Sequence, residues 1–296
     1  MRRILLTGKG GQVGWELQRS LAPLGRVVAL DSQALNLADA DAIRRTVREI
    51  APHIIVNPAA YTAVDKAESE PELAYAVNGT APGVLAEEAK RCGAFLVHFS
   101  TDYVFDGSKA GAYQEGDATN PLSVYGKSKL AGEQAIRAAA AAHLILRTSW
   151  VYGMRGRNFL LTMLRLARER SEMNIVADQI GAPTWCRSLA EVTALMLAQL
   201  YAPGSSEANR QHLSGTYHLT SSGSVSWHGF ATEIIRLAGI APAPHLQAIP
   251  SSDYPTPAVR PKNSVLSNDK LYQAFGLQAG DWLDNLQLCM QEQNKG

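Results

Sequence analysis

The stretch from Asn120 to Gly132 reads NPLSVYGKSKLAG and holds one tyrosine, Tyr125, and two lysines, Lys127 and Lys129. If this stretch is helical, residues four positions apart share a face and residues two apart do not. We therefore predict that Lys129 lies beside Tyr125, whereas Lys127 points away as a solvated surface charge. This spacing also occurs by chance in many helices, so its interpretation depends on the residues around it.

A phenol beside an ammonium group can act as a general acid. A free tyrosine has a pKa near ~10 and does not readily give and regain a proton at neutral pH. An ammonium about 4–5 Å away, at an effective dielectric of about 20, contributes roughly 3–4 kcal/mol. We expect this to lower the pKa of Tyr125 by about two to three units. The pair would then suit the reduction of a carbonyl, with Ser100 and Thr101 of FSTDYVF within reach of the substrate oxygen.

The elements that must position this pair are visible in the first half of the chain. Short apolar runs at 2–8, 26–31, 53–60 and 94–105 alternate with helical patterns at 11–25, 39–52 and 71–93. Such alternation predicts βαβ units with a parallel sheet, and strands that are apolar throughout predict helices on both faces. A helix from Tyr125 and a strand at 143–153 follow. We predict an α/β fold with a doubly wound, Rossmann-like parallel sheet, and assign residues 1–150 to a dinucleotide-binding domain.

The second half, residues 151–296, is expected to be mainly a smaller α/β substrate-binding domain, with some segments returning to the Rossmann sheet. Helical patterns at 158–170, 188–201 and 227–239 accompany short strands at 173–179 and 215–221. The polar segment 106–123 is longer than most plain connections, which suggests a role of its own. The proline-rich tract 249–266 is either a surface linker or a fixed anion-binding loop.

Glycines at the first strand-to-helix turn indicate a dinucleotide site. TGKGGQVG spaces Gly8, Gly11 and Gly14 so that the backbone can turn tightly and a helix N-terminus can face a pyrophosphate. Asp31 ends the next strand, where a carboxylate accepts from the adenosine ribose and repels a 2′-phosphate. No arginine follows Asp31, so the pattern leans towards NADH over NADPH; a helix-capping aspartate is the alternative. The small residues of NPAA at 57–60 would let a cofactor lie against the sheet.

Composition excludes several classes of protein. The net charge of +1 and a pI near 7.8 provide no field for nucleic acid or an anionic membrane. The three cysteines lack metal-ligand spacing, and an odd number suits a reducing compartment. The apolar run near the start is too short for a signal peptide, and no window approaches ~20 apolar residues. We expect a cytoplasmic protein.

Several longer motifs resemble the extended branch of the short-chain dehydrogenase/reductase superfamily, which acts on nucleotide sugars. GKGGQVGWEL, NPAAYTAVDKAESEPE, FSTDYVFDG, YGKSKLAGE, LRTSWVYG, DQIGAPT and YPTPAVRPKNSVL are all similar to the dTDP-4-dehydrorhamnose reductase family, and they extend from Gly8 to Leu266. The resemblance implies NAD(P)H-dependent reduction of the C4 ketone of dTDP-4-dehydro-L-rhamnose to dTDP-L-rhamnose.

The resemblance also implies roles for individual residues. Tyr125 would be the proton donor, Lys129 its partner and a ligand of the nicotinamide ribose, and Thr101 would hold the C4 oxygen or tune Tyr125. The cofactor would be lined by Gly8, Gly11, Gln12, Val13, Gly14, Asp31, Ala60, Tyr61, Thr62, Phe99, Tyr125 and Lys129. The sugar would contact Thr101, Asp102 and Trp150. Apart from the resemblance, we assign the diphosphate and thymidine end to Arg260, Lys262 and Asn263.

Family members are also associated with a homodimer and with Mg²⁺ at a dimer contact built from glutamates. Glu16 matches one such position, whereas Arg187 stands near Glu191 where an acid would be expected. Two other functions stay open. A related regulatory subunit of some methionine adenosyltransferases only binds a dinucleotide, and related enzymes act as nucleotide-sugar epimerases or dehydratases. The dehydratases carry Thr-Asp-Glu where this chain has Thr101, Asp102 and Tyr103, so elimination would lack its base.

Overall fold

The structure is a computed structural model that describes residues 1–293, and no helix among them is both long and apolar enough to cross a membrane. The strands are β1 (Arg3–Leu6), β2 (Arg26–Ala29), β3 (Ile54–Asn57), β4 (Phe95–Thr101), β5 (His143–Thr148), β6 (Val151–Tyr152), β7 (Glu172–Val176), β8 (Ile180–Gly181), β9 (Thr184–Trp185), β10 (Gly215–His218), β11 (Val225–Ser226) and β12 (His245–Ile249). The α-helices are α1 (Gln12–Ser20), α2 (Ala40–Ile50), α3 (Val64–Ala67), α4 (Pro71–Tyr75), α5 (Ala81–Cys92), α6 (Val124–Ala139), α7 (Phe159–Glu169), α8 (Cys186–Leu200), α9 (Glu207–His212), α10 (Trp227–Ala238), α11 (Asp269–Phe275) and α12 (Trp282–Gln293). Short segments are the 3₁₀ turns η1 (Ala22–Leu24), η3 (Asp102–Val104) and η4 (Ser251–Asp253) and the π-helical turn η2 (Ala76–Thr80).

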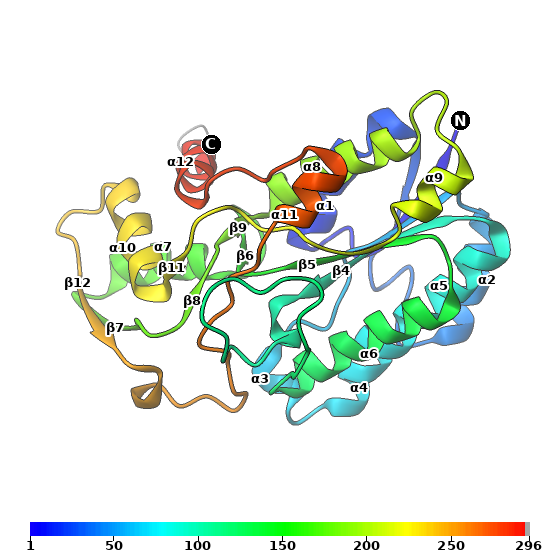
Figure 1. Cartoon of the computed structure of the whole chain (residues 1–296). Helices are drawn as coiled ribbons and strands as arrows, with labels where there is room; N and C mark the ends of the chain where they lie inside the picture. The colour runs from blue at the N-terminus through cyan, green and yellow to red at the C-terminus, as the bar shows by residue number, and fades with distance from the viewer. Residues whose placement is uncertain (294–296) are drawn as a thin grey trace.

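A six-stranded parallel sheet forms the centre, in the order β10-β5-β4-β3-β1-β2 (Figure 1). The predicted α/β fold with a Rossmann-like parallel sheet is confirmed. The chain steps from β1 to β2 in one direction and then returns past β1 to β3, so the strand order reverses there. Ligands of such sheets bind at the carboxyl ends of the strands beside this reversal.

Helices cover both faces of the sheet because both faces of its strands are apolar (Figure 1). One face is packed by α1, α8 and α11, which bury Leu17, Leu189 and Leu271. The other is packed by α2, α5 and α6, with Ile43, Leu85 and Ile136 buried. The stretch that holds Tyr125 and Lys129 therefore lies on α6, which is packed against the sheet.

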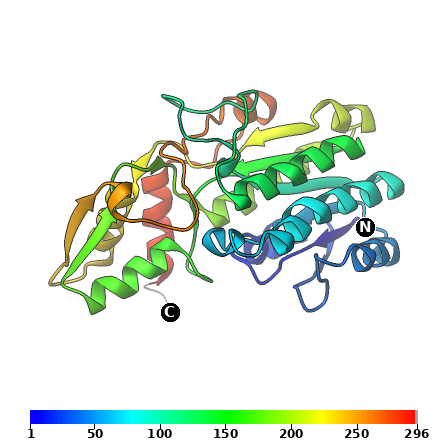
Figure 2. The same ribbon diagram turned by 90° about the horizontal axis from the view of Figure 1, so that it is seen from below.

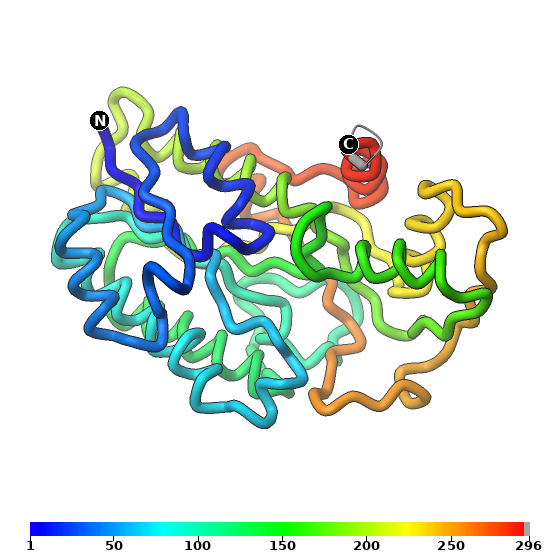
Figure 3. The backbone as a smooth tube through the Cα atoms, turned by 180° about the vertical axis from the view of Figure 1, so that it is seen from behind, coloured from blue at the N-terminus to red at the C-terminus, as the bar shows by residue number. Residues whose placement is uncertain are grey.

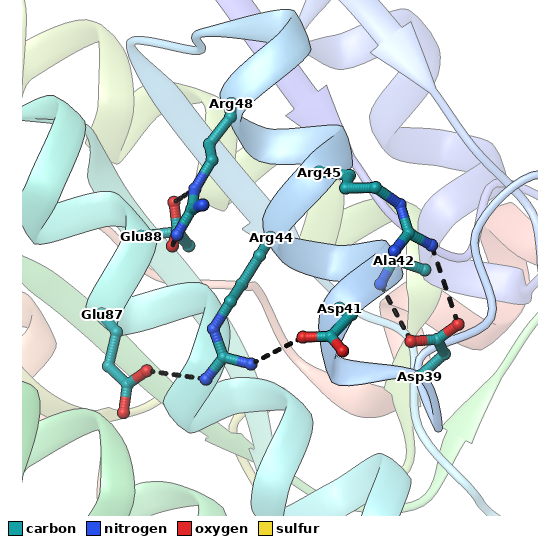
Figure 4. Close-up of polar contacts among 8 residues, drawn as sticks. All are labelled: Asp39, Asp41, Ala42, Arg44, Arg45, Arg48, Glu87 and Glu88. Carbon is teal, nitrogen blue, oxygen red and sulfur yellow. Dashed lines mark hydrogen bonds and ion pairs between the residues drawn. The ribbon is translucent and has the colours of Figure 1, made fainter.

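Ion pairs join α2 to α5 on the second face (Figure 4). Asp39 caps α2 by accepting from the Ala42 amide at 2.9 Å. Arg48 donates to both carboxylate oxygens of Glu88 at 3.1 and 2.7 Å, and the Glu88 side chain is buried while Arg48 stays half-exposed. These contacts hold α2 against α5.

A smaller α/β part lies to one side of the sheet layers (Figure 2). There α7, α10 and α12 surround an apolar cluster that includes Leu160, Phe230 and Leu286. Beside it β7 pairs with β12, and β8 pairs with β11. One segment of the second half, β10, instead pairs with β5 at the edge of the large sheet.

Two predicted elements are interrupted. The expected strand at 143–153 splits into β5 and β6 because Trp150 has a left-handed backbone with φ of +47°. The expected helix at 71–93 passes through the π turn η2, where Asn78 faces Gly132 of α6 so closely that a Cβ on Gly132 would meet the Asn78 carbonyl oxygen at 2.1 Å. The turn aims the Asn78 side chain at the backbone of Tyr61, with hydrogen bonds of 2.8 and 3.0 Å.

The proline-rich tract is held to the rest of the protein by hydrogen bonds at Ala258 and at Asn263, so the linker alternative is wrong. Figure 3 shows the course of its backbone in orange. The Asn263 amide donates to the carbonyl oxygens of Lys109 and Gly111 at 2.8 and 2.7 Å, which ties the tract to the long polar segment 106–123. Near its middle, Ala258 is buried, and its amide donates to Asp65 on α3 at 3.2 Å.

Candidate active site

The glycine turn leaves the N-terminus of α1 open. Gly8 adopts a φ of +60°, and a Cβ there would meet the Cβ of Ala59 at 2.9 Å. A Cβ on Gly14 would meet the Gly8 carbonyl oxygen at 2.1 Å, so only glycine permits this close crossing. Gly11 caps α1 without a side-chain hydrogen bond. The first amide groups of the helix therefore remain free to bind an anion such as a pyrophosphate.

Asp31 follows β2 and faces the same cavity as the glycine turn. It accepts from the Ala34 amide at 3.0 Å, and the ammonium of Lys9 lies 3.1 Å from its other oxygen. The Ala34 hydrogen bond, followed by Lys9, lowers the pKa of Asp31. Sequence reasoning missed Lys9, although its place inside the glycine turn next to an acidic strand end was visible. Its charge offsets the repulsion that Asp31 alone would exert on a 2′-phosphate.

A cavity of about 590 Å³ extends from these groups to the helix that carries Tyr125 and Lys129. Its lining includes most of the predicted cofactor residues, namely Gly8, Gly11, Gln12, Val13, Gly14, Asp31, Ala60, Thr62, Phe99, Tyr125 and Lys129. Tyr61 is not among the lining residues, because its hydroxyl turns away to donate to Glu70 at 2.6 Å. Sequence reasoning missed Thr148 and Arg157, which also line the cavity. The Thr148 hydroxyl is buried there without a partner in the described part of the chain.

The helix predicted to begin at Tyr125 begins at Val124 as α6, because the Ser123 hydroxyl caps it by accepting from the Gly126 amide at 3.2 Å. Tyr125 and Lys129 both face the cavity and Lys127 is exposed, as the helical spacing predicts. The prediction that Lys129 lowers the pKa of Tyr125 is wrong for the structure as it stands. Burial raises the pKa of Tyr125 to about 12, and a hydrogen bond with Thr101 partly opposes this rise.

Lys129 points towards β4. Its Nζ donates to the carbonyl oxygen of Phe99 at 2.6 Å and lies 3.2 Å from Nε2 of His98. Only 1% of the residue is exposed, and burial lowers the pKa of Lys129 to about 8 while the charge of Glu133 raises it. The two groups of β4 therefore hold the ammonium at the wall of the cavity.

The C-terminal end of β4 and the turn after it carry three polar side chains, those of Ser100, Thr101 and Asp102. The Thr101 hydroxyl donates to Asp102 at 3.0 Å and accepts from the Tyr103 amide at 3.2 Å. Burial raises the pKa of Asp102 to about 6, and its second oxygen has no partner among the described residues. Ser100 was expected to reach the substrate oxygen, but its hydroxyl donates to Glu133 at 2.6 Å. Thr101 and Asp102 are therefore the polar groups of this stretch whose side chains are not bound to Glu133.

The residues predicted for the far end of the substrate are dispersed. Arg260 lines a second cavity of about 810 Å³ with Trp227, and Trp227 stacks on Trp150 with ring centres 3.5 Å apart. Neither Lys262 nor Asn263 lines it: Lys262 is an exposed partner of Asp178, and the Asn263 side chain holds the segment 106–123.

Arg260 is not a free cation in this structure. Its guanidinium binds both carboxylate oxygens of Asp65, at 3.1 and 2.8 Å, and so joins the tract to α3. An anion entering the second cavity would therefore share Arg260 with Asp65.

The residues around Glu16 do not fit a Mg²⁺ ion. Glu16 is paired with Arg19 and, at 3.3 Å, with Arg187, and Arg187 also pairs with Glu292. The guanidinium of Arg187 thus occupies the space between the carboxylates and already neutralises them. Among residues 1–293 no group of three or more histidine, cysteine, aspartate or glutamate side chains is suited to a metal ion.

Comparisons with known proteins agree with this geometry. The sequence model of the family described as RmlD substrate binding domain matches residues 1–295. A dTDP-4-dehydrorhamnose reductase of Burkholderia thailandensis is 50% identical over 98% of each chain. The dTDP-4-dehydrorhamnose reductase of Escherichia coli strain K12 is 48% identical over 94% of each chain.

Solved structures give the same result. The dTDP-4-dehydrorhamnose reductase of Bacillus anthracis, crystallised in complex with NADP, superposes with a TM-score of 0.88 at 37% identity, covering 98% of this chain and 99% of the other. The orthologue from Clostridium acetobutylicum has a TM-score of 0.89 at 36% identity, covering 99% of each chain. The chain described here belongs to the dTDP-4-dehydrorhamnose reductase family.

Proposed function

We propose that this protein reduces the C4 ketone of dTDP-4-dehydro-L-rhamnose to the C4 hydroxyl of dTDP-L-rhamnose, using NADPH or NADH. The observation that carries the proposal is the single cavity in which the glycine turn, Asp31, Tyr125 and Lys129 meet. Its residues fit a dinucleotide, since the open N-terminus of α1 suits the pyrophosphate and the small residues after β3 leave room beside the sheet. Relatives named as reductases along nearly the whole chain support the substrate.

The proposed chemistry adds one hydride and one proton across the C=O bond. Bound NADPH or NADH would supply the hydride to C4 of the sugar. Tyr125 gives its phenolic proton to the oxygen, so that the ketone becomes an alcohol. A pKa of about 12 keeps Tyr125 protonated at neutral pH, which is the form that this step requires. An alkoxide forming at C4 is more basic than the phenolate, so the transfer becomes downhill as charge develops.

Two neighbours support that step. Lys129 places a positive charge at the same cavity wall, where it would hydrogen-bond the nicotinamide ribose and so position the coenzyme. Thr101, which lowers the pKa of the phenol and so partly offsets its burial, would hold the C4 oxygen of the sugar. Asp102, whose pKa burial raises to about 6, accepts from the Thr101 hydroxyl and is assigned to a sugar hydroxyl by the resemblance.

We propose both coenzymes because Asp31 and Lys9 form one pair. The carboxylate suits the ribose hydroxyls of NADH, and the ammonium suits the 2′-phosphate of NADPH. The crystallised relative with NADP supports the second. We assign residues 1–150 to the dinucleotide and 151–296 mainly to the sugar nucleotide, with β10 as the segment that returns to the sheet.

We also propose a cytoplasmic homodimer. The three thiols are free, which fits a reducing compartment. The helices α1, α8 and α12 are tied together by Arg187, and they carry Trp15, Leu195 and Leu288, which are 42%, 51% and 51% exposed. Light scattering of the purified protein measures this state directly, and a monomer at micromolar concentration would contradict it.

The test of the function is a direct assay. Purified protein is mixed with dTDP-4-dehydro-L-rhamnose and each coenzyme in turn, and oxidation is followed at the nicotinamide absorbance. We expect turnover that requires the sugar, with dTDP-L-rhamnose as product. Binding of coenzyme without turnover would favour the regulatory-subunit alternative, and release of water or inversion at another carbon would favour a dehydratase or an epimerase.

A further inference from the structure

A row of buried polar side chains crosses the sheet beneath Lys129. Thr7 follows β1, Asn57 ends β3, and His98 lies beside Asn57 in the register of β4. The Thr7 hydroxyl lies 2.5 Å from one end of the Asn57 side-chain amide, and the other end lies 3.0 Å from Nδ1 of His98. All three residues are at most 2% exposed. Buried polar groups in the middle of a parallel sheet are costly unless they are fully paired. The presence of three of them side by side therefore needs a physical explanation.

The row ends on Lys129, because Nε2 of His98 lies 3.2 Å from Nζ. An ammonium carries only donors, so this contact is favourable when Nε2 is an acceptor and the ring proton is on Nδ1. Asn57 then turns its amide oxygen to the ring and its nitrogen to Thr7, an exchange that needs only a half-turn of the amide. Every member of the row keeps at least one hydrogen bond in this arrangement.

We propose that His98 is a positioning residue for the reaction: its neutral Nε2, held by Asn57, accepts a hydrogen bond from Lys129 and fixes the ammonium at the wall of the coenzyme cavity. The inference rests on the proposed function in that Lys129 is there the partner of Tyr125. Two of the three ammonium protons are then occupied, by His98 and by the carbonyl oxygen of Phe99. The third is free for Tyr125 or for the coenzyme.

Burial and nearby positive charge keep His98 neutral. Burial, followed by the charges of Lys129 and His143, holds the pKa of His98 well below its usual range. The other titratable groups that face Lys129 are Tyr125 and Glu133 on α6, and only Glu133 favours the ammonium. His98 is therefore neutral at neutral pH, and in the tautomer proposed here its Nε2 stabilises the charged form of Lys129 by hydrogen bonding.

Removing that acceptor has a measurable consequence. In His98→Leu the ammonium loses one of its two fixed partners, so the pKa of Lys129 falls further. The alkaline limb of kcat/KM, which reports the free enzyme, should move to lower pH by about one unit. His98→Gln places an amide oxygen near the position of Nε2 and should restore most of the shift. His98→Asn reaches only the position of Nδ1 and should resemble the leucine variant.

The matched control is His218→Leu, because His218 is also fully buried on a strand of the large sheet but its ring makes no hydrogen bond in the described residues. It should leave the alkaline limb in place, because it removes a buried ring without touching Lys129. An alkaline limb of kcat/KM at the same pH in wild type and in folded His98→Leu would overturn the proposal. A shift of the same size in His218→Leu would also overturn it.

A measurement on the wild type needs no variant and no substrate. Ring nitrogen chemical shifts of ¹⁵N-histidine-labelled protein should show His98 neutral, with the proton on Nδ1 and an unprotonated Nε2. A proton on Nε2 would overturn the contact with the ammonium. Absence of turnover with the sugar nucleotide, by contrast, would remove the proposed function while leaving the tautomer result to decide the role of His98.

Discussion

Replacing Glu133 by glutamine should cost far more stability than its conservative shape suggests. Glu133 lies on α6 and is fully buried. Its carboxylate accepts from Nε and Nη2 of Arg147 on β5, at 2.9 and 2.7 Å, and from the hydroxyl of Ser100 on β4 at 2.6 Å. Arg147 is itself only 3% exposed. Glu133→Gln therefore leaves a buried guanidinium without its counter-charge and turns amide protons towards its donors.

Breaking one partner of a buried ion pair typically costs ~3–5 kcal/mol. That is a large part of the ~5–15 kcal/mol by which proteins are stable. Urea unfolding, followed by the fluorescence of the five tryptophans, measures the loss as a lower midpoint at an unchanged slope. The control is Glu88→Gln, whose partners Arg48 and Arg91 are half-exposed and can be hydrated by water. Its loss should be clearly smaller.

The pH dependence gives a second measure of the same pair. Burial acts to raise the pKa of Glu133, but the hydrogen bonds and charge of Arg147 outweigh it and lower the pKa. A lowered pKa in the folded state contributes stability above the unfolded value of about 4.3, and this is lost as the pH falls through the folded value. The gap between wild type and Glu133→Gln should therefore narrow in acid. Equal losses for Glu133→Gln and Glu88→Gln at neutral pH would refute the reasoning.

The remaining predictions concern the proposed reaction. Tyr125→Phe should keep its affinity for coenzyme, measured by nicotinamide fluorescence, and lower kcat by ~10²–10⁴; near-normal turnover would remove Tyr125 from the role of acid. In the same assay Lys129→Ala should lower kcat severely and Lys127→Ala only mildly. Equal losses of kcat would contradict the argument that Tyr125 and Lys129 share a helical face. Asp31→Ala should raise the KM for NADH more than that for NADPH, and Lys9→Ala should do the reverse; equal changes for both coenzymes would remove the pair from the adenosine ribose.

Local features of this protein could be predicted from its sequence. The alternation of apolar runs with helical patterns predicts the parallel sheet because each strand must be covered on both faces. The glycine turn is predictable because Gly14 approaches the carbonyl oxygen of Gly8 within one short stretch of chain, although the close approach of Ala59 to Gly8 could not be foreseen. The shared face of Tyr125 and Lys129 follows from helical geometry alone, and both residues line the cavity.

Pairs between distant residues could not be predicted. Nothing in the proline-rich tract shows that Arg260 binds Asp65, which lies 195 residues away, so its guanidinium was expected to be free for a diphosphate. Likewise, the break in the strand after Thr148 depends on Trp150, whose ring stacks on Trp227 from α10. These contacts are decided by how the two parts of the chain pack, and short-range spacing carries no information about them.

The partners of a charged side chain are harder to predict than its position along a helix. Tyr125, Lys129 and Glu133 follow one another at intervals of four residues, so the sequence places all three on one stripe of α6. Spacing alone suggests that Lys129 should lower the pKa of the phenol, yet the structure turns its ammonium to Phe99 and His98 on β4. Because the sheet, and not the neighbouring turn of the helix, supplies the acceptors, the sheet decides where the positive charge rests. The acid–base pair is therefore set jointly by a helix and by a row of buried polar groups on the strands beneath it.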